Sequence, residues 1–171
     1  MRLTKKVANA AALGLVTAMS VLSVPTASAA PYCDPHYYYS FPSRTSYHIR
    51  ASGTSFKDGP GGTITGSVTS SHTVTATGTV SAGASISGIV ASAKVDVSAS
   101  ISKSVAITVG HTYSHNITAR KYGNMRYGSW GYKLNWQYRY MYSNCNSVVK
   151  SYGTAKVPTG KVGWKYWETS S

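Results

Sequence analysis

The chain has 171 residues, and its 17 Lys and Arg outnumber its four Asp and Glu, so the formal charge is +13 at neutral pH. So few carboxylates argue against paired acid and base catalysis, and the sequence has no nucleophile elbow, HExxH motif, phosphate-binding loop or CxxC motif. We therefore expect a non-enzymatic protein that uses no cofactor and no metal ion.

The first 29 residues have the pattern of an export signal. Three basic residues precede a mostly apolar run over residues 7–22, and Ala27-Ser28-Ala29 is typical of a signal-peptidase site. No later segment has the run of about 18 apolar residues that a membrane helix needs. We expect a secreted, extracellular protein whose mature chain begins at about Ala30.

The mature chain keeps fourteen Lys and Arg against four acids, and the basic residues are concentrated from Lys103 onward. An electrostatic field of this sign favours anionic partners. We expect an anionic membrane or an anionic cell-surface polymer as the partner, and no specific nucleic acid. The alternative is that the charge serves only solubility.

The two cysteines, Cys33 and Cys145, both lie in the exported part of the chain. An even number of cysteines in a secreted chain, without the spacing of a metal site, predicts one intramolecular disulfide. Such a bridge closes a loop of about 110 residues and contributes about 2–4 kcal/mol of stability. Free or intermolecular thiols are the alternative.

Residues 30–52 predict a Tyr-rich, extended N-terminal arm that Pro35 and Pro42 interrupt. Its large side chains either pack on their own domain or dock into the groove of a partner. The candidate docking residues are Tyr37, Tyr38, Tyr39 and Phe41. Residues 53–171 are expected to form a single all-β domain.

Residues 63–117 predict one very long, Ser- and Thr-rich β-hairpin. From Thr63 to Ser81 every odd position is Ser or Thr, and most even positions are small or apolar. This alternation with period two is typical of a strand and excludes a helix. After residues 88–91 the phase reverses, as a tight hairpin requires. Residues whose numbers sum to 179 then pair, and nearly all apolar side chains fall on one face.

The predicted tip of this hairpin is apolar, whereas exposed hairpin tips are usually polar. Residues 76–86 and 93–103 each match the length of about 9–11 residues that a transmembrane strand needs. Lys94 and Asp96 lie on the hydroxyl face, where a water-filled lumen would solvate them. The alternative is a structural hairpin that packs flat on a neighbouring sheet or partner. The candidate membrane-inserting residues are Ile86, Gly88, Ile89, Val90 and Ala91.

The aromatic-rich C-terminal part predicts further strands. Aromatic and polar residues alternate over residues 130–142, after a predicted loop at residues 122–128. Residues 148–157 and 162–167 predict a closing hairpin that turns at Pro158. The alternation is compatible with stacking on sugars or bases, or with a place at a membrane interface. Ordinary core packing is the alternative and is favoured for one of the two strand faces, which leaves the face with Lys133 and Arg139 exposed. The candidate surface residues of this kind are Lys133, Trp136 and Arg139.

Together these elements predict an all-β fold: an elongated, twisted antiparallel sheet with one very long Ser/Thr-rich hairpin and an aromatic-rich C-terminal sheet. A hairpin with a phase reversal and an apolar tip, set in such a sheet, resembles the aerolysin-type β-pore-forming toxins, especially the epsilon-toxin and mosquitocidal-toxin branch. The resemblance covers residues 53–167. It implies that residues 76–103 insert into a membrane and that the protein assembles into a homo-oligomeric ring.

The export signal, the small size and the Tyr-rich arm also resemble the small adaptor subunits of umbrella toxin particles from filamentous actinobacteria. This resemblance implies a bridging role among larger secreted toxin subunits, with residues 30–45 as the docking element. The sequence therefore favours a toxin-like, membrane-active protein. An adaptor subunit is the second interpretation, and a cell-wall or polysaccharide-binding protein is the third.

Overall fold

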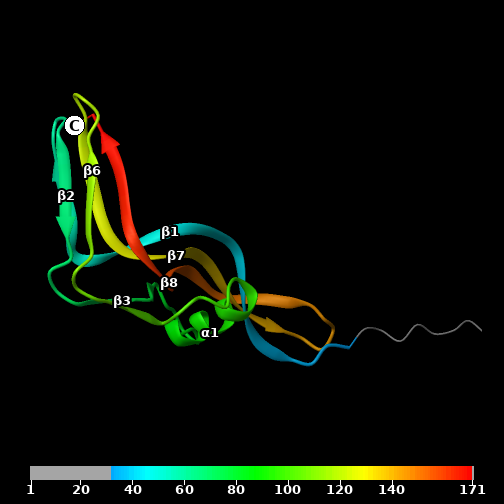
Figure 1. Ribbon diagram of the computed structural model, residues 1–171. Helices are drawn as coiled ribbons and strands as arrows, with labels where there is room; N and C mark the ends of the chain where they lie inside the picture. The colour runs from blue at the N-terminus through cyan, green and yellow to red at the C-terminus, as the bar shows by residue number, and fades with distance from the viewer. Residues whose placement is uncertain (1–31, 171) are drawn as a thin grey trace, which may run out of the picture. The chain divides into compact units, whose positions relative to one another are not determined.

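The computed structural model describes residues 32–170, so the predicted export signal lies outside the described residues. Strands dominate this part of the chain, and one short α-helix interrupts them (Figure 1). The predicted all-β fold class is confirmed. The elements in chain order are β1 (His36–Asp58), β2 (Thr63–Ser67), β3 (His72–Thr75), β4 (Thr77–Gly78), α1 (Ile86–Asp96), β5 (Ser104–Ile107), β6 (Thr112–Asn116), β7 (Tyr122–Met141) and β8 (Ser147–Thr169).

Three long antiparallel strands form most of the main sheet, whose strand order is β1-β7-β8-β4. The strand predicted over residues 130–142 is confirmed, but the loop predicted at residues 122–128 is wrong because β7 already begins at Tyr122. Glycine permits the strands to approach closely there. A Cβ at Gly128 would clash with the carbonyl oxygen of Ile49 on β1.

The closing hairpin predicted at the C-terminus is wrong, because the whole segment forms the single strand β8. Pro158 lies within β8, opposite Gly131 of β7. The register shifts between Ser129 and Gly131, where β8 carries extra residues, so the Pro-Thr-Gly sequence makes a bulge in place of a turn. The Thr159 hydroxyl stabilises the bulge by donating to the Trp130 carbonyl oxygen at 2.6 Å.

The N-terminal arm belongs to the sheet, so its prediction as a separate extended arm is wrong. β1 pairs with β7 along its length, apart from two register shifts. Pro42 is accommodated because one shift falls between Ser40 and Ser43, which places the proline outside the regular ladder. Tyr39 and Phe41 pack against the core beneath α1.

Two short ladders follow the register that the alternation predicts for the long hairpin. β2 pairs with β6, for example Thr63 with Asn116, and β3 pairs with β5, for example Val74 with Val105. In both ladders the paired residue numbers sum to 179. The predicted register is therefore confirmed for the outer parts of both arms.

The middle of the predicted hairpin folds differently, so the predicted tip is wrong for this structure. Residues 86–96 form α1, in which Ile89 is 0% exposed and Val90 is 5% exposed. These side chains pack with Leu134 and Trp136 of the sheet, and a turn in solvent would leave them in water. The five residues predicted at the tip are all in this helix: Ile86, Gly88, Ile89, Val90 and Ala91.

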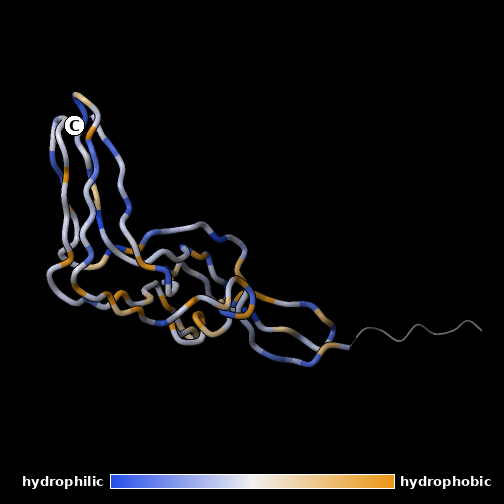
Figure 2. Tube along the Cα trace, viewed as in Figure 1, coloured by the Kyte–Doolittle hydropathy of each residue, from blue (hydrophilic) through white to orange (hydrophobic). Residues whose placement is uncertain are grey.

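α1 and the two ladders cover opposite faces of the long sheet. Leu134 and Trp136 of β7 pack in the core under α1, whereas Met125 and Tyr127, at odd positions of the same strand, pack under the ladders. Side chains at odd and even positions of a strand point to opposite faces. Figure 2 shows apolar stretches in α1 and in the strands beside it, while the strands around β2 and β6 are mostly polar.

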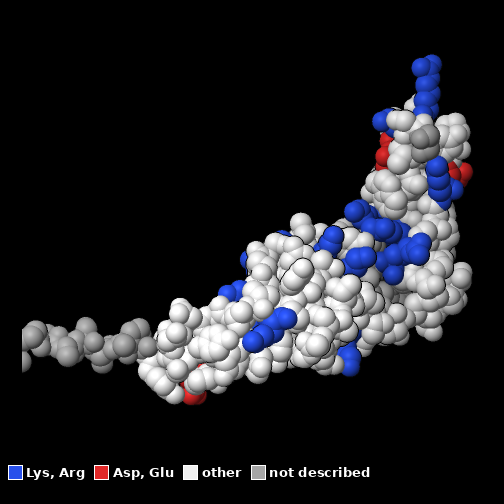
Figure 3. Space-filling model, turned by 180° about the vertical axis from the view of Figure 1, so that it is seen from behind, with Lys and Arg blue, Asp and Glu red and all other residues white. Residues whose placement is uncertain are grey.

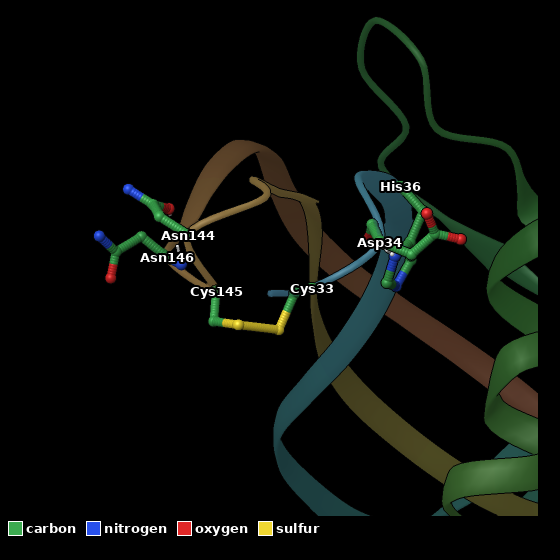
Figure 4. Close-up of a disulfide and its surroundings, with 6 residues drawn as sticks. All are labelled: Cys33, Asp34, His36, Asn144, Cys145 and Asn146. Atoms are coloured by element: carbon green, nitrogen blue, oxygen red, sulfur yellow. Dashed lines mark hydrogen bonds between the residues drawn. A yellow bond between two sulfur atoms is a disulfide. The ribbon is translucent and has the colours of Figure 1, made fainter. Parts of the chain in front are cut away.

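Cys33 and Cys145 form the predicted intramolecular disulfide, with their Cα atoms 5.0 Å apart (Figure 4). The bridge joins the segment before β1 to the turn between β7 and β8. A backbone hydrogen bond of 3.0 Å from the Cys33 amide to the Ser143 carbonyl oxygen reinforces the junction. A disulfide indicates an oxidising compartment outside the cytosol.

A pair of substitutions on α1 tests its place in the core. Val90→Asp puts a charge where the side chain is 5% exposed, so the free energy of unfolding should fall by about 3 kcal/mol or more. Val95→Asp, on the same helix but at an 86% exposed position, should cost less than about 1 kcal/mol. Chemical denaturation measures both. Equal and small losses would mean that residues 86–96 do not pack on the sheet.

Candidate functional site

We use the name nested hairpin for residues 63–117, whose two arms carry the ladders β2–β6 and β3–β5. The two arms separate at the outer edge of β8. The last bond between the arms runs from the Ala76 amide to the Lys103 carbonyl oxygen, at 2.8 Å, and it still follows the predicted register. Beyond this bond each arm pairs with β8 in place of the other arm. The edge of β8 is therefore the point where the observed structure departs from the continuous hairpin.

Each arm turns in its own direction along β8. On the first arm Thr77 of β4 pairs with Lys156, and on the second Ile101 forms a bridge with Thr159. These two partners are three positions apart along β8, which corresponds to about 10 Å. The hydrogen bond from the Thr79 amide to β8 carries the first arm further away. Residues 80–100 therefore do not pair with the opposite arm. They form the connection between the two arms, and this connection contains α1.

α1 is built from residues that prefer strands. Four of its 11 residues are Ile or Val, whose branched side chains lower helix propensity. Ser85 caps the helix by accepting a hydrogen bond of 3.0 Å from the Gly88 amide. Val95 is apolar and yet 86% exposed. The helix therefore depends on the packing of Ile89 and Val90 more than on its own propensity.

Lys94 and Asp96, predicted to face a lumen, lie exposed near the C-terminal end of α1. Because both residues are in a helix, they do not lie on the hydroxyl-covered face of a strand. The predicted lumen-facing placement is therefore wrong for this structure. It applies only to an extended form of the segment.

The Tyr-rich start of β1 lines a cavity of about 700 Å³ beside α1. Tyr37 stacks on Tyr138 with ring centroids 5.1 Å apart, and the Tyr39 hydroxyl accepts a hydrogen bond from the Ser85 amide at 3.0 Å. Tyr38 also lines the cavity. The candidate docking residues thus pack largely on their own domain, although Tyr37 remains 55% exposed.

The predicted surface residues of β7 separate into two groups. Lys133 is exposed and Arg139 is half-buried. Arg139 donates hydrogen bonds to Gln137 at 2.7 Å and to Ser147 at 2.9 Å. Trp136 is 1% exposed, so its prediction as a surface residue is wrong. Its ring fills the core beneath α1, because it alternates with the outward-facing polar residues.

A basic face, which sequence reasoning missed, lies on the half of the sheet that the ladders cover from the other side. Directly opposed residues of neighbouring strands point to the same face. Arg126 of β7 lies opposite Lys165 of β8, and Asn124 lies opposite Trp167 and Lys57. Figure 3 shows a group of neighbouring Lys and Arg side chains on the face of the molecule that it presents. We define the basic face by Arg50, Lys57, Arg126, Trp130, Lys165 and Trp167.

Arg126 is the centre of this basic face. Its guanidinium lies over the Trp167 ring, 5.3 Å from the centroid, and its Nη2 donates to the His48 carbonyl oxygen at 3.3 Å. Arg126, Lys165 and Trp167 line a cavity of about 420 Å³. Two cations and an aromatic wall can hold an anionic group.

His48 lies buried at the edge of the basic face, with 2% of its surface exposed. Its Nε2 donates to the Gly163 carbonyl oxygen at 3.0 Å, and its ring meets Trp130 edge-on at 4.6 Å. Burial lowers the pKa of His48 below its usual 6.5, and the charges of Arg126 and Lys165 lower it further. His48 is therefore neutral at pH 7.

No sequence pattern marks the basic face, because its residues come from three strands and alternate with buried side chains. Only the register of β1, β7 and β8 brings them together. The spacing of Arg126 and Lys165 in the chain carries no signal that they are neighbours.

The chain matches no protein-family model, and no curated protein matches its sequence significantly. Among residues 32–170, no helix is long and apolar enough to cross a membrane. The same residues contain no cluster of His, Cys, Asp or Glu that could hold a metal ion.

The depressed pKa of His48 predicts a pH dependence of stability. The unfolded chain binds a proton near pH 6.5, whereas the folded chain binds it only at lower pH, so the free energy of unfolding should fall as the pH drops through this window. Above pH 6.5 the contribution of His48 should be complete. Denaturation at pH 7.5 and pH 5 should show a smaller difference for His48→Gln than for the unchanged protein. An equal difference in both would contradict the assignment.

Proposed function

We propose that this protein is a secreted, non-enzymatic, membrane-active protein in which residues 76–103 leave β8, α1 unfolds, and the segment extends the β3–β5 ladder into one continuous hairpin. The observation that carries the proposal is the common register. The ladders β2–β6 and β3–β5 share it, and the alternation continues it through residues that now form α1.

The extended form would use features that the helix leaves unused. In the helix Val95 is 86% exposed, whereas in the extended register it would lie on the same face as Val97 and Ile101. The opposite face would then carry Ser, Thr, Lys94 and Asp96. A segment whose local pattern disagrees with its observed structure is expected at functional sites.

Water and lipid would favour different forms of this segment. In water α1 buries Ile89, Val90 and Ala93 against the sheet, and an extended hairpin would expose them. In a bilayer the lipid would cover the apolar face. A hairpin alone leaves unpaired backbone groups at its two edges, which a hydrocarbon environment does not tolerate. Several copies of the chain would therefore have to close a barrel together.

A second candidate function is an adaptor in a larger secreted assembly, and one observation favours it. β1 is the outermost strand of the main sheet on its side. An unpaired strand edge can accept a strand from a partner by β-augmentation. In this case residues 76–103 would keep their observed structure with α1 intact, and the protein would co-purify with a larger subunit.

A disulfide across β4 and β8 tests the proposal. Thr77 and Lys156 are exposed and directly paired, so Thr77→Cys with Lys156→Cys should crosslink on oxidation. The bridge would hold the first arm on β8. We expect the oxidised variant to release little dye from vesicles containing phosphatidylserine, and mild reduction to restore release to the level of the unchanged protein.

The unchanged protein treated with the same reductant controls for effects on Cys33 and Cys145. Each single cysteine variant controls for the loss of the original side chain. Dye release by the oxidised double variant at the full rate would contradict the proposed extension. No release by the unchanged protein, together with co-purification of a larger secreted protein, would favour the adaptor.

A further inference from the structure

We infer that the cavity between Arg126, Lys165 and Trp167 on the basic face binds a phosphate group carried on a small alcohol. The inference goes beyond the proposed function, and it does not depend on extension of the hairpin. It rests on four observations: unused donors, the absence of a neighbouring acid, two half-buried cations at one cavity, and an aromatic wall.

Arg126 has donors that no described residue uses. Its Nη2 donates to the His48 carbonyl oxygen, but its buried Nε has no hydrogen-bond partner and its Nη1 forms none with residues 32–170. A buried donor without a partner is unfavourable in the folded protein. The guanidinium carbon lies 5.3 Å from the centroid of the Trp167 ring. A half-buried guanidinium whose Nη1 is free can donate charge-assisted hydrogen bonds to a phosphate oxygen in the cavity.

No carboxylate neutralises this face. Within residues 32–170 no Lys or Arg forms an ion pair with an acid, and Glu168, the acid nearest in the chain, points the other way. It accepts hydrogen bonds from the Thr118 amide at 2.9 Å and the Tyr166 hydroxyl at 2.8 Å, on the side that the ladders cover. The hydrogen bond from the Thr118 backbone amide is the main reason that the pKa of Glu168 is lowered. Glu168 is thus ionised, and its Oε1 accepts its hydrogen bonds on the side that the ladders cover.

Two directly opposed cations are not by themselves evidence of an anion site, because the sheet has a second such pair. Lys133 and Lys156 are also directly opposed on β7 and β8, but both are exposed to water, which screens their repulsion. Arg126 and Lys165 are half-buried, and both line the same cavity. Their repulsion is screened less, so an anion between them would relieve more of it.

The size and lining of the cavity indicate an ester more than a bare ion. Its volume of about 420 Å³ exceeds what one phosphate group fills, and Trp167 forms a flat wall next to the two cations. The wall can pack against the carbon atoms of a glycerol or sugar. Glycerol phosphate is the simplest probe with both features, and this unit occurs in anionic lipids as well as in phosphate-containing surface polymers.

Calorimetric titration of the full-length mature protein with glycerol phosphate tests the inference. Arg126→Gln with Lys165→Gln should weaken the affinity by about tenfold or more, since two charge-assisted contacts are lost. The matched control is Lys133→Gln with Lys156→Gln, which removes the same charge from the same two strands. We expect it to weaken binding by less than about twofold. If the first double variant fails to fold, Lys165→Gln alone carries the comparison.

A second readout reports on the site itself. Arg126 and Lys165 are the charged groups that lower the pKa of His48, so bound phosphate should offset them and raise that pKa in an NMR titration. An unchanged His48 pKa at saturating probe, equal weakening in the two double variants, or no binding to the unchanged protein would each overturn the inference.

Vesicles distinguish the two sources of the phosphate group. Binding to phosphatidic acid vesicles that Arg126→Gln with Lys165→Gln abolishes would assign the site to a lipid head group. Binding of free glycerol phosphate without such vesicle binding would assign it to a soluble or polymeric ester. Neither result depends on dye release, so failure here and failure of the proposed hairpin extension remain separate outcomes.

Discussion

Competition for backbone partners at the edge of β8 determines the structure of residues 76–103. Up to Ala76 and Lys103 the two arms of the nested hairpin are each other's partners, and beyond that point β8 binds both arms. Backbone amides and carbonyls in a sheet require partners, but they do not dictate which strand supplies them. Because both arms pair with β8 and no longer with each other, a loop that contains α1 connects them. α1 then covers Leu134 and Trp136.

The long sheet separates two surfaces of different chemistry. Alternation along β7 turns Leu134 toward α1 and Tyr127 toward the ladders, and it leaves Arg126 on the uncovered part of the first face. The basic face and the nested hairpin therefore lie on opposite sides of the same half of the sheet. An anionic surface that binds Arg126 and Lys165 would orient the sheet without contacting the ladders, so the proposed binding and the proposed hairpin extension would use different surfaces.

The sequence predicted the features that depend on local periodicity, and it failed where tertiary partners decide. The Ser/Thr alternation gave the register that the ladders follow, and the two cysteines gave the disulfide. The helix was missed because its alternation is typical of a strand and its helical form depends on packing against the sheet, with Leu134 and Trp136 among its contacts. Pro158 and Pro42 were interpreted as breaks, yet bulges absorb both. The basic face was invisible because the pairing of Arg126 with Lys165 depends on a register between distant strands.

The central claim is that residues 76–103 have two sets of partners, and a distance between the two arms tests it most directly. Thr79 and Ser100 are exposed. Thr79 bonds to Thr154 of β8, whereas Ile101, the residue after Ser100, bridges to Thr159, five positions further along β8 or about 17 Å. In the extended register Thr79 and Ser100 would be direct partners, with Cβ atoms about 5 Å apart. Spin labels at Thr79→Cys and Ser100→Cys should show little dipolar broadening in solution and strong broadening on anionic vesicles. An unchanged spectrum on vesicles that the labelled protein permeabilises would contradict the account.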